Sequence, residues 1–216
     1  MIEKIIHSME LIKESLDKYS KIAVACSFGK DSVVILHLAL SIKPDIPVFT
    51  VMTPFKPKET IEYKDYLTNL WNINLTEYFQ RDNIEAKDRR LWATDPEECC
   101  GYFKVKPTME AVKGLDAWIC GLRNTEGPTR EIYKEVEYRG DLIKINPILT
   151  WTELDVWRYF AFNNIPVHPW YKKGYRSLGC EPCTVLVSDS EPERSGRWKG
   201  TDKCGGECGI HTKTLK

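Results

Sequence analysis

The sequence predicts an α/β fold with a doubly wound, mostly parallel sheet. Short apolar runs at residues 22–25, 46–51, 75–79 and 117–121 are typical of buried strands, and the intervening segments carry apolar residues at helical spacing. Strands that alternate with helices require right-handed crossovers, which give a parallel sheet with helices on both faces. The length of 216 residues suits one substantial hydrophobic core.

The loop after the first predicted strand has the composition of an anion-binding site. It opens an apolar helical run and consists of Ser27, Phe28, Gly29, Lys30, Asp31 and Ser32. In such a loop a glycine lets the backbone approach a phosphate, and the N–H groups that open the next helix point at it. Ser27, Lys30 and Ser32 can add hydroxyl and ammonium donors. The G-x-x-x-x-G-K-[ST] spacing of a Walker A loop is absent, and an ordinary strand-to-helix turn is the alternative.

The predicted helices flank this arrangement. Residues 2–16 carry apolar positions at helical spacing, so we expect an amphipathic helix ahead of the first strand. After the helix that follows the phosphate loop, a further helix is predicted over residues 59–71, with Ile61, Leu67 and Leu70 facing inward. Parallel strands direct ligands to their carboxyl ends, where the loop of residues 27–32 also lies.

Two further elements follow in the second half of the chain. The runs 136–138 and 142–145 flank an Arg-Gly-Asp turn, which predicts a β-hairpin. Residues 152–163 predict a helix with Thr152 as its N-cap and Asp155 completing a capping box.

The charge balance excludes several classes of partner. Lysine plus arginine equals aspartate plus glutamate at 31 each, so no global field holds a nucleic acid or an acidic membrane surface, and a small anion is the expected ligand. No apolar run approaches the length of a membrane span, and the N-terminal stretch is charged, which predicts a cytoplasmic protein. From residue 188 onward the chain is rich in glycine, serine and charge. We therefore expect an α/β domain over residues 1–187 and a mobile C-terminal tail over residues 188–216.

The eight cysteines favour metal or thiol chemistry over structural disulfides. Cys99-Cys100 and Cys180-x-x-Cys183 are two pairs, each able to reach one metal centre. Four thiolates suit an iron–sulfur cubane or a structural zinc. Adjacent cysteines are unusual for zinc, so the pattern favours a [4Fe–4S] cluster, with zinc and then a disulfide as the alternatives.

Cys208 has a different setting, in the sequence Glu-Cys-Gly-Ile-His near the end of the tail. Cationic neighbours lower a thiol pKa, and exposure gives a substrate access to the thiol; both suit a nucleophile. The alternative is a tail cysteine without a role.

Taken together, these motifs resemble the assimilatory sulfonucleotide reductases, within the superfamily of adenine nucleotide α hydrolase-like proteins. The resemblance runs over most of the chain. It rests on the Ser-x-Gly-Lys-Asp-Ser loop, Cys-Cys-x-x-x-Lys-x-x-Pro at 99–107, and the sequences of residues 114–130, 146–160 and 163–184. It also rests on Arg-Ser-Gly-Arg-Trp at 194–198 and Glu-Cys-Gly-Ile-His at 207–211.

The resemblance implies roles for particular residues. The cluster ligands would be Cys99, Cys100, Cys180 and Cys183, and the nucleophile Cys208. The cations around the phosphosulfate would be Lys104, Arg123, Arg194 and Arg197, with His211 beside them. Nucleotide contacts would include the phosphate loop, Thr53 and Gly121. The placement of cations is chemically reasonable, because guanidinium groups suit phosphate and sulfate oxygens and meet the departing negative charge.

The activity implied is reduction of adenylyl sulfate (APS) to sulfite and AMP through a cysteine S-sulfonate, with thioredoxin or glutaredoxin as reductant. The 3′-phosphorylated substrate (PAPS) is the second choice, and whether the chain forms a homo-oligomer stays open. An ATP pyrophosphatase-type enzyme is a rival that Lys30 would suit, and a non-catalytic nucleotide-binding metal protein is another.

The sequence departs from the family in three places. The loop has Gly-Lys-Asp-Ser rather than Gly-Ala-Glu-Asp. Met52 and Pro54 replace the Asp and Gly of a Leu-Asp-Thr-Gly stretch, of which Thr53 is kept. Finally, Cys204 is an additional thiol four residues before Cys208.

Overall fold

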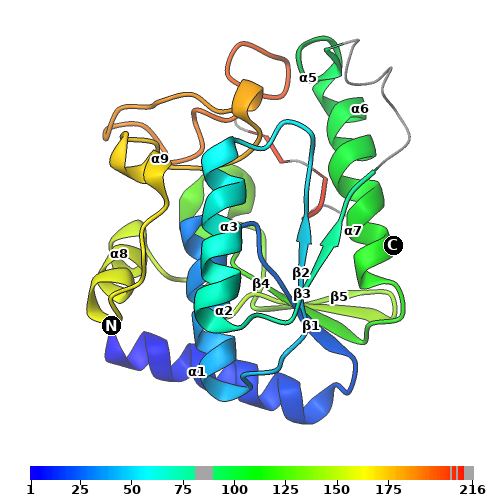
Figure 1. The fold of residues 1–216 in the computed structure, drawn as a ribbon, viewed down its shortest axis with the longest axis vertical. Helices are drawn as coiled ribbons and strands as arrows, with labels where there is room; N and C mark the ends of the chain where they lie inside the picture. The colour runs from blue at the N-terminus through cyan, green and yellow to red at the C-terminus, as the bar shows by residue number, and fades with distance from the viewer. Residues whose placement is uncertain (81–89, 205, 208, 212–216) are drawn as a thin grey trace.

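The computed structural model describes residues 1–80, 90–204, 206–207 and 209–211, and within them six strands form one sheet (Figure 1). The strands are β1 (Ile22–Ala25), β2 (Val48–Val51), β3 (Leu75–Tyr78), β4 (Ala117–Cys120), β5 (Val136–Arg139) and β6 (Leu142–Ile145). The α-helices are α1 (Ile2–Lys18), α2 (Lys30–Ile42), α3 (Lys58–Trp71), α5 (Leu91–Thr94), α6 (Pro96–Cys100), α7 (Lys106–Val112), α8 (Glu153–Phe162) and α9 (Pro169–Lys172). A π-helix, η1 (Gly101–Val105), joins α6 to α7, and short 3₁₀ turns follow at η2 (Asn124–Glu126), η3 (Pro128–Arg130) and η4 (Glu181–Cys183).

The strand order is β3-β2-β1-β4-β6-β5, and every neighbouring pair except β5 with β6 is parallel. The doubly wound, mostly parallel sheet is therefore confirmed. The antiparallel pair β5–β6 confirms the predicted hairpin, with Arg139 opposite Leu142.

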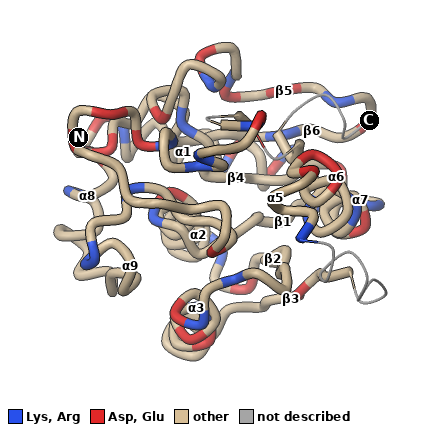
Figure 2. The backbone as a smooth tube through the Cα atoms, turned by 90° about the horizontal axis from the view of Figure 1, so that it is seen from above, with Lys and Arg blue, Asp and Glu red and all other residues tan. Residues whose placement is uncertain are grey.

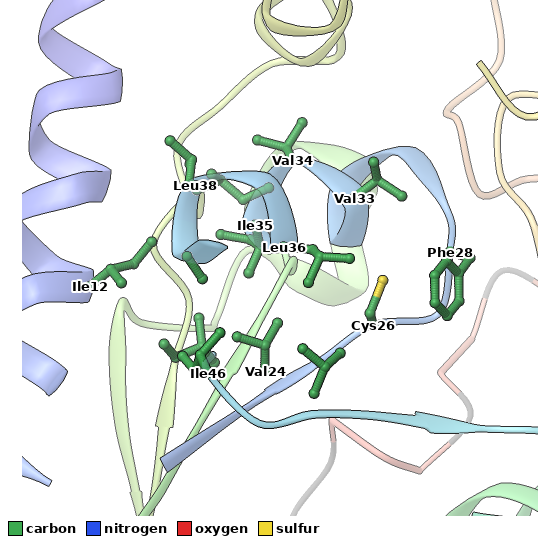
Figure 3. Packing of buried hydrophobic residues seen from close by; sticks show 14 of the residues in the cluster. Ile12, Val24, Cys26, Phe28, Val33, Val34, Ile35, Leu36, Leu38 and Ile46 are labelled. Atoms are coloured by element: carbon green, nitrogen blue, oxygen red, sulfur yellow. The ribbon is translucent and has the colours of Figure 1, made fainter. Parts of the chain in front are cut away.

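Apolar side chains that point alternately to the two faces of the strands form a core on each face of the sheet. In β1, Val24 belongs to the larger cluster, packed under α1, α2, α3 and α8, whereas Ala23 belongs to the smaller cluster, which includes residues of α7. Successive side chains of a strand point to opposite faces, so a short apolar run supplies both cores. Figure 3 shows the larger core, with Ile12 of α1 near α2 and with Cys26 and Phe28 close to the start of α2.

The strand order sets the position of the site. The chain runs outward from β1 through β2 to β3 and then returns to place β4 on the other side of β1. Ligands of open α/β sheets bind outside the carboxyl ends of the strands at such a reversal. The described part of the C-terminal tail, orange to red in Figure 1, reaches this same edge.

Most predicted helix boundaries agree with the structure. Helix α8 begins after Thr152, whose hydroxyl accepts a hydrogen bond from the Asp155 backbone N–H, and the reciprocal half of the capping box is present. The inward face predicted for α3 is partly wrong. Leu67 is fully buried, but Ile61 and Leu70 are 39% and 51% exposed. The helix buries Thr60, Tyr63 and Lys64 instead, so its inner face is partly polar.

Acidic and basic residues are interspersed over the described chain, in keeping with the equal numbers of each (Figure 2). None of the helices in the described ranges has the length and apolarity needed to cross a bilayer. Several described residues of the tail are buried, among them Glu193, Arg197 and Trp198. The tail is therefore docked in this structure, and its mobility stays a prediction.

Candidate active site

A cavity of about 190 Å³ lies at the carboxyl ends of β1, β2 and β4. Its walls come from the phosphate loop, the loop after β2, the η1–α7 segment, the turns after β4 and the C-terminal tail. Segments far apart in the sequence thus meet where the strand order reverses. We call this cavity the nucleotide pocket.

The phosphate loop forms one wall, because Ser27, Gly29, Asp31 and Ser32 line the pocket. The Ser32 hydroxyl accepts a hydrogen bond from the Ser27 backbone N–H at 3.2 Å and donates to the Gly29 carbonyl at 2.9 Å. The loop is thus closed by its own polar groups, and two hydroxyls face the cavity.

Gly121, at the end of β4, is required by packing. A Cβ atom there would lie 2.6 Å from the carbonyl carbon of Asp31 and 2.7 Å from the backbone nitrogen of Ser32. Only glycine lets β4 approach the first turn of α2 this closely. Gly121 also lines the pocket, as the resemblance led us to expect.

Two residues of the phosphate loop have buried side chains. The Phe28 side chain is 1% exposed and packs in the larger core, so it offers nothing to a nucleotide. Lys30 is also 1% exposed; its ammonium bonds the Glu193 carboxylate at 2.7 Å and the Arg176 carbonyl at 2.6 Å. Burial disfavours the charged ammonium, but Asp31 and then Tyr171 and Glu193 outweigh it and raise the pKa of Lys30. In this structure the Lys30 charge is paired within the protein, and its donation to a phosphate stays a prediction.

Arg123 is likewise buried in the interior and paired there with carboxylates. Its guanidinium is fully buried and bonds Asp31 at 2.5 Å and Glu193 at 2.7 Å. It is not among the residues that line the pocket, so the structure does not place it around the phosphosulfate. Arg123 and Lys30 together hold Glu193 and thereby tie the tail to α2 and to the turn after β4.

Lys104, Arg194 and Arg197, the other expected cations, do line the nucleotide pocket. Arg197 donates to the carbonyls of Leu178 at 2.6 Å and Cys183 at 3.2 Å. A side chain at Gly179 would overlap the Arg197 guanidinium, so this glycine makes room for it.

Sequence reasoning missed two cations of the pocket, Lys56 and Arg130. Arg130 bonds Glu126 and, at 2.7 Å, Glu207 of the tail. Arg194 also lies 3.3 Å from Glu207, and burial with the neighbouring Arg130 lowers its pKa to about 10. Both missed residues lie after the carboxyl end of a strand that neighbours β1: Lys56 follows β2 and Arg130 follows β4. That position was the available signal.

The end of the described tail lines the pocket opposite the phosphate loop. The His211 ring is stacked on Trp118 with 6.2 Å between centroids, and the His211 carbonyl accepts a hydrogen bond from Arg139 at 3.1 Å. Burial and then nearby Lys144 hold the pKa of His211 well below its usual value, so the ring is neutral here. Cys208, the predicted nucleophile, lies outside the described residues, although its neighbours Glu207 and Ile210 are described.

A second, smaller cavity is lined by all four cysteines of the predicted metal site. We call it the cysteine pocket, and its sulfur-bearing residues are Cys99, Cys100, Cys180 and Cys183. All four are buried and none forms a disulfide. Within the described ranges, no three or more Cys, His, Asp or Glu side chains converge tightly enough for a single metal ion. Four buried thiols that line one small cavity are a donor set that fits an iron–sulfur cluster, in which each iron takes one thiolate.

Lys104 and Trp198 connect the two cavities, since both residues line the nucleotide pocket and the cysteine pocket. Thr53 lines only the cysteine pocket, where its hydroxyl is 3.2 Å from the Cys180 sulfur, so the structure does not place it as a nucleotide contact. Burial opposes ionisation of Cys180, but the Lys104 ammonium and the Thr53 hydrogen bond outweigh it and lower the pKa of that thiol. The π-helix that carries Lys104 directly follows Cys100, and such distortions are frequent at functional sites.

The reversed strand order, the phosphate loop and the cationic pocket define an α/β protein with an anion-binding site at the carboxyl edge of its sheet. The sequence profile of the phosphoadenosine phosphosulfate reductase domain matches residues 21–186. The chain belongs to this family.

Relatives extend the match beyond the family domain. The adenosine 5′-phosphosulfate reductase of Lysinibacillus sphaericus is 35% identical over 214 residues, covering 94% of this chain and 90% of that protein. The adenosine 5′-phosphosulfate reductase of Mycobacterium tuberculosis is 34% identical over 184 residues, covering 82% of this chain and 72% of that protein.

Solved structures show the same fold. A phosphate complex of phosphoadenylyl-sulfate reductase from Candida auris has a TM-score of 0.72 at 22% identity, covering 82% of this chain and 90% of that one. The FMN adenylyltransferase of Candida glabrata, in complex with FAD and pyrophosphate, has a TM-score of 0.66 at 20% identity, and the match covers 93% of this chain and 75% of that one.

Proposed function

We propose that this protein reduces APS to sulfite and AMP, with Cys208 as the nucleophile. The observation that carries the proposal is one pocket that gathers the phosphate loop, the cations Lys104, Arg194 and Arg197, and tail residues on both sides of Cys208. The similarity to adenosine 5′-phosphosulfate reductases over 94% of the chain supports the same substrate.

In the proposed reaction, the Cys208 thiolate attacks the sulfate sulfur. The bond from this sulfur to the phosphate oxygen breaks, AMP leaves with the electron pair, and an enzyme S-sulfonate remains. Arg194, Arg197 and Lys104 stabilise the negative charge that develops on the departing phosphate. The neutral His211 ring, stacked on Trp118, closes the wall beside the tail and limits the access of water.

A dithiol then completes the cycle. One thiolate of a thioredoxin or glutaredoxin attacks the Cys208 sulfur and releases sulfite, and the second thiol resolves the mixed disulfide. The two electrons come from this reductant, so we place the enzyme in the cytoplasm, where such dithiols are kept reduced.

Cys99, Cys100, Cys180 and Cys183 would hold a [4Fe–4S] cluster. Bound there, the cluster supplies a fixed charge distribution and a structural link between α6, η4 and the nearby tail. Anaerobically purified protein should contain about four iron and four sulfide per chain. Cys183→Ser should lose most of both, whereas the control Cys120→Ser, which removes a buried thiol hydrogen-bonded to Asn146, should keep them. Stoichiometric zinc without sulfide would contradict the assignment.

The decisive experiment measures sulfite release from APS and from PAPS side by side, with a dithiol donor present. Rapid release from APS that requires Cys208 is the expected result, and faster release from PAPS would move the assignment to the 3′-phosphorylated substrate. No release from either would refute the reductase.

The residue that favoured the rival ATP pyrophosphatase-type function is paired within the protein. Lys30 suited that chemistry on the sequence alone, but its ammonium is paired with Glu193 and does not line the pocket. Likeness in fold to an adenylyltransferase at 20% identity does not restore it.

A further inference from the structure

Lys56 lines the nucleotide pocket but has no part in the proposed reaction. It lies in the loop between β2 and α3, next to Phe55, and its side chain is partly buried and lines the pocket. Its ammonium lies 3.5 Å from the carbonyl oxygen of Ser27, the first residue of the phosphate loop. A cation therefore stands beside the phosphate loop.

The charges around Lys56 differ from those around Arg130 and Arg194. Burial lowers the pKa of Lys56 to about 8; the nearby Cys180 opposes this change, and Lys104 and Arg197 add to it. Within the described residues no carboxylate lies within ion-pair distance of Lys56 or of Arg197, and both groups donate to backbone carbonyls. By contrast, Arg130 and Arg194 share the carboxylate of Glu207.

The cations of the pocket therefore fall into two groups. Arg130 and Arg194 are matched by the Glu207 carboxylate, whereas Lys56 and Arg197 have no carboxylate within ion-pair distance among the described residues. Buried positive charge is costly without a counter-charge, so these two cations suit an anion that arrives with a ligand.

We propose that Lys56 is a further ligand of the phosphosulfate group, binding it together with Arg197 at the rim of the phosphate loop. The proposal rests on the proposed function and deepens it, because it assigns the anionic end of the sulfonucleotide to a defined side of the pocket. Lysine suits this task as a compact point charge for a phosphate oxygen. Lys56 belongs to the same loop as Met52 and Pro54, where the sequence departs from the family.

The test is nucleotide binding by titration calorimetry to cluster-containing protein in a Cys208→Ser background, which prevents turnover. The ligands are APS, AMP, adenosine and adenosine 3′,5′-bisphosphate. Lys56→Met should weaken binding of APS and AMP by roughly 10- to 100-fold, the range for one charge-assisted hydrogen bond. It should leave the affinity for adenosine unchanged, and Lys56→Arg should recover most of the loss. The control is Lys58→Met, two residues away, whose side chain is 85% exposed and pairs with Glu62 on the surface.

Three results would overturn the proposal. Equal weakening for adenosine would mean that Lys56 only maintains the shape of the loop. Weakening confined to adenosine 3′,5′-bisphosphate would place the ammonium at the ribose end. Loss of iron with unchanged nucleotide affinity would assign Lys56 to the cysteine pocket.

This titration and the sulfite-release assay together separate this proposal from the proposed function. If the wild type releases sulfite from APS but Lys56→Met binds APS normally, only the role of Lys56 fails. If binding of AMP depends on Lys56 but the wild type releases no sulfite, Lys56 is supported as a phosphate ligand and the reductase activity fails.

Discussion

Glu193 is the residue whose removal should most clearly expose how the tail is held. Its carboxylate is 5% exposed and bonds the Lys30 ammonium and the Arg123 guanidinium, each at 2.7 Å. Both partners are themselves buried, at 1% and 0% exposure. Glu193→Gln keeps the side-chain volume but removes the negative charge, so both cations remain buried beside a neutral amide.

The expected loss follows from these two contacts. A hydrogen bond to a charged group contributes about 1.5–3 kcal/mol, and breaking a buried ion pair costs about 3–5 kcal/mol. Lys30 keeps the Arg176 carbonyl and Arg123 keeps Asp31, so we expect the lower part of this range, about 3 kcal/mol. For a chain of this length that corresponds to a fall in Tm of roughly 6–12 °C.

The assay is thermal and urea unfolding followed by far-UV circular dichroism on protein with matched iron content. Glu191→Gln is the control, because Glu191 lies two residues earlier and its side chain is 40% exposed, where it accepts hydrogen bonds at a surface turn from Ser188 and lies 3.8 Å from the exposed Lys199. It should leave Tm unchanged. A double variant with Lys30→Met should be less destabilised than the sum of the single variants, since it leaves fewer unmatched charges. A Tm for Glu193→Gln equal to the wild type would refute the reasoning.

Three further predictions concern the tail, the helix α8 cap and the additional thiol. Arg194→Ala should slow sulfite release by on the order of 10²-fold with iron content unchanged, because a donor to the developing negative charge is lost. Activity equal to the wild type would mean that Arg194 serves only as an ion-pair partner of Glu207. Burial raises the pKa of Asp155, but hydrogen bonds from Lys4 and from the cap outweigh it and lower that pKa to about 2. Its stabilising contribution is therefore complete above about pH 4 and lost as pH falls through 2. Accordingly, Asp155→Asn should be less stable than the wild type to urea at pH 7, and this difference should narrow at pH 3 and vanish near pH 2; a constant difference would contradict the assignment. The hypothesis that Cys204 resolves the S-sulfonate on Cys208 expects wild type, given APS without reductant, to free sulfite and become about two mass units lighter, while Cys204→Ser retains the S-sulfonate; equal retention in both would exclude it.

Local sequence signals were sufficient for most of the fold. The four-residue strand β1 and the capped start of α8 follow from apolar runs and from one short-range hydrogen-bonded motif. The inner face of α3 could not be read in this way. Lys64 is buried there because Glu77 of the neighbouring strand β3 and Asp65 pair with it, and a partner on another element is invisible to periodicity.

The sequence by itself determined which residue types were available for chemistry and where they lie along the chain. It indicated the phosphate loop and the two pairs of cysteines, because each is a compact motif with its own chemical logic. Only the tertiary structure decided which way each charged side chain turns. In the sequence, Lys30 resembled a phosphate ligand. The fold, however, brings the Glu193 carboxylate of the tail to within 2.7 Å of the Lys30 ammonium, and the two charges pair. Lys56 had no motif to mark it, yet the same fold leaves it facing the pocket. The reason is that the strength of an ion pair depends on distance and burial, and both are set by contacts between segments far apart in the sequence.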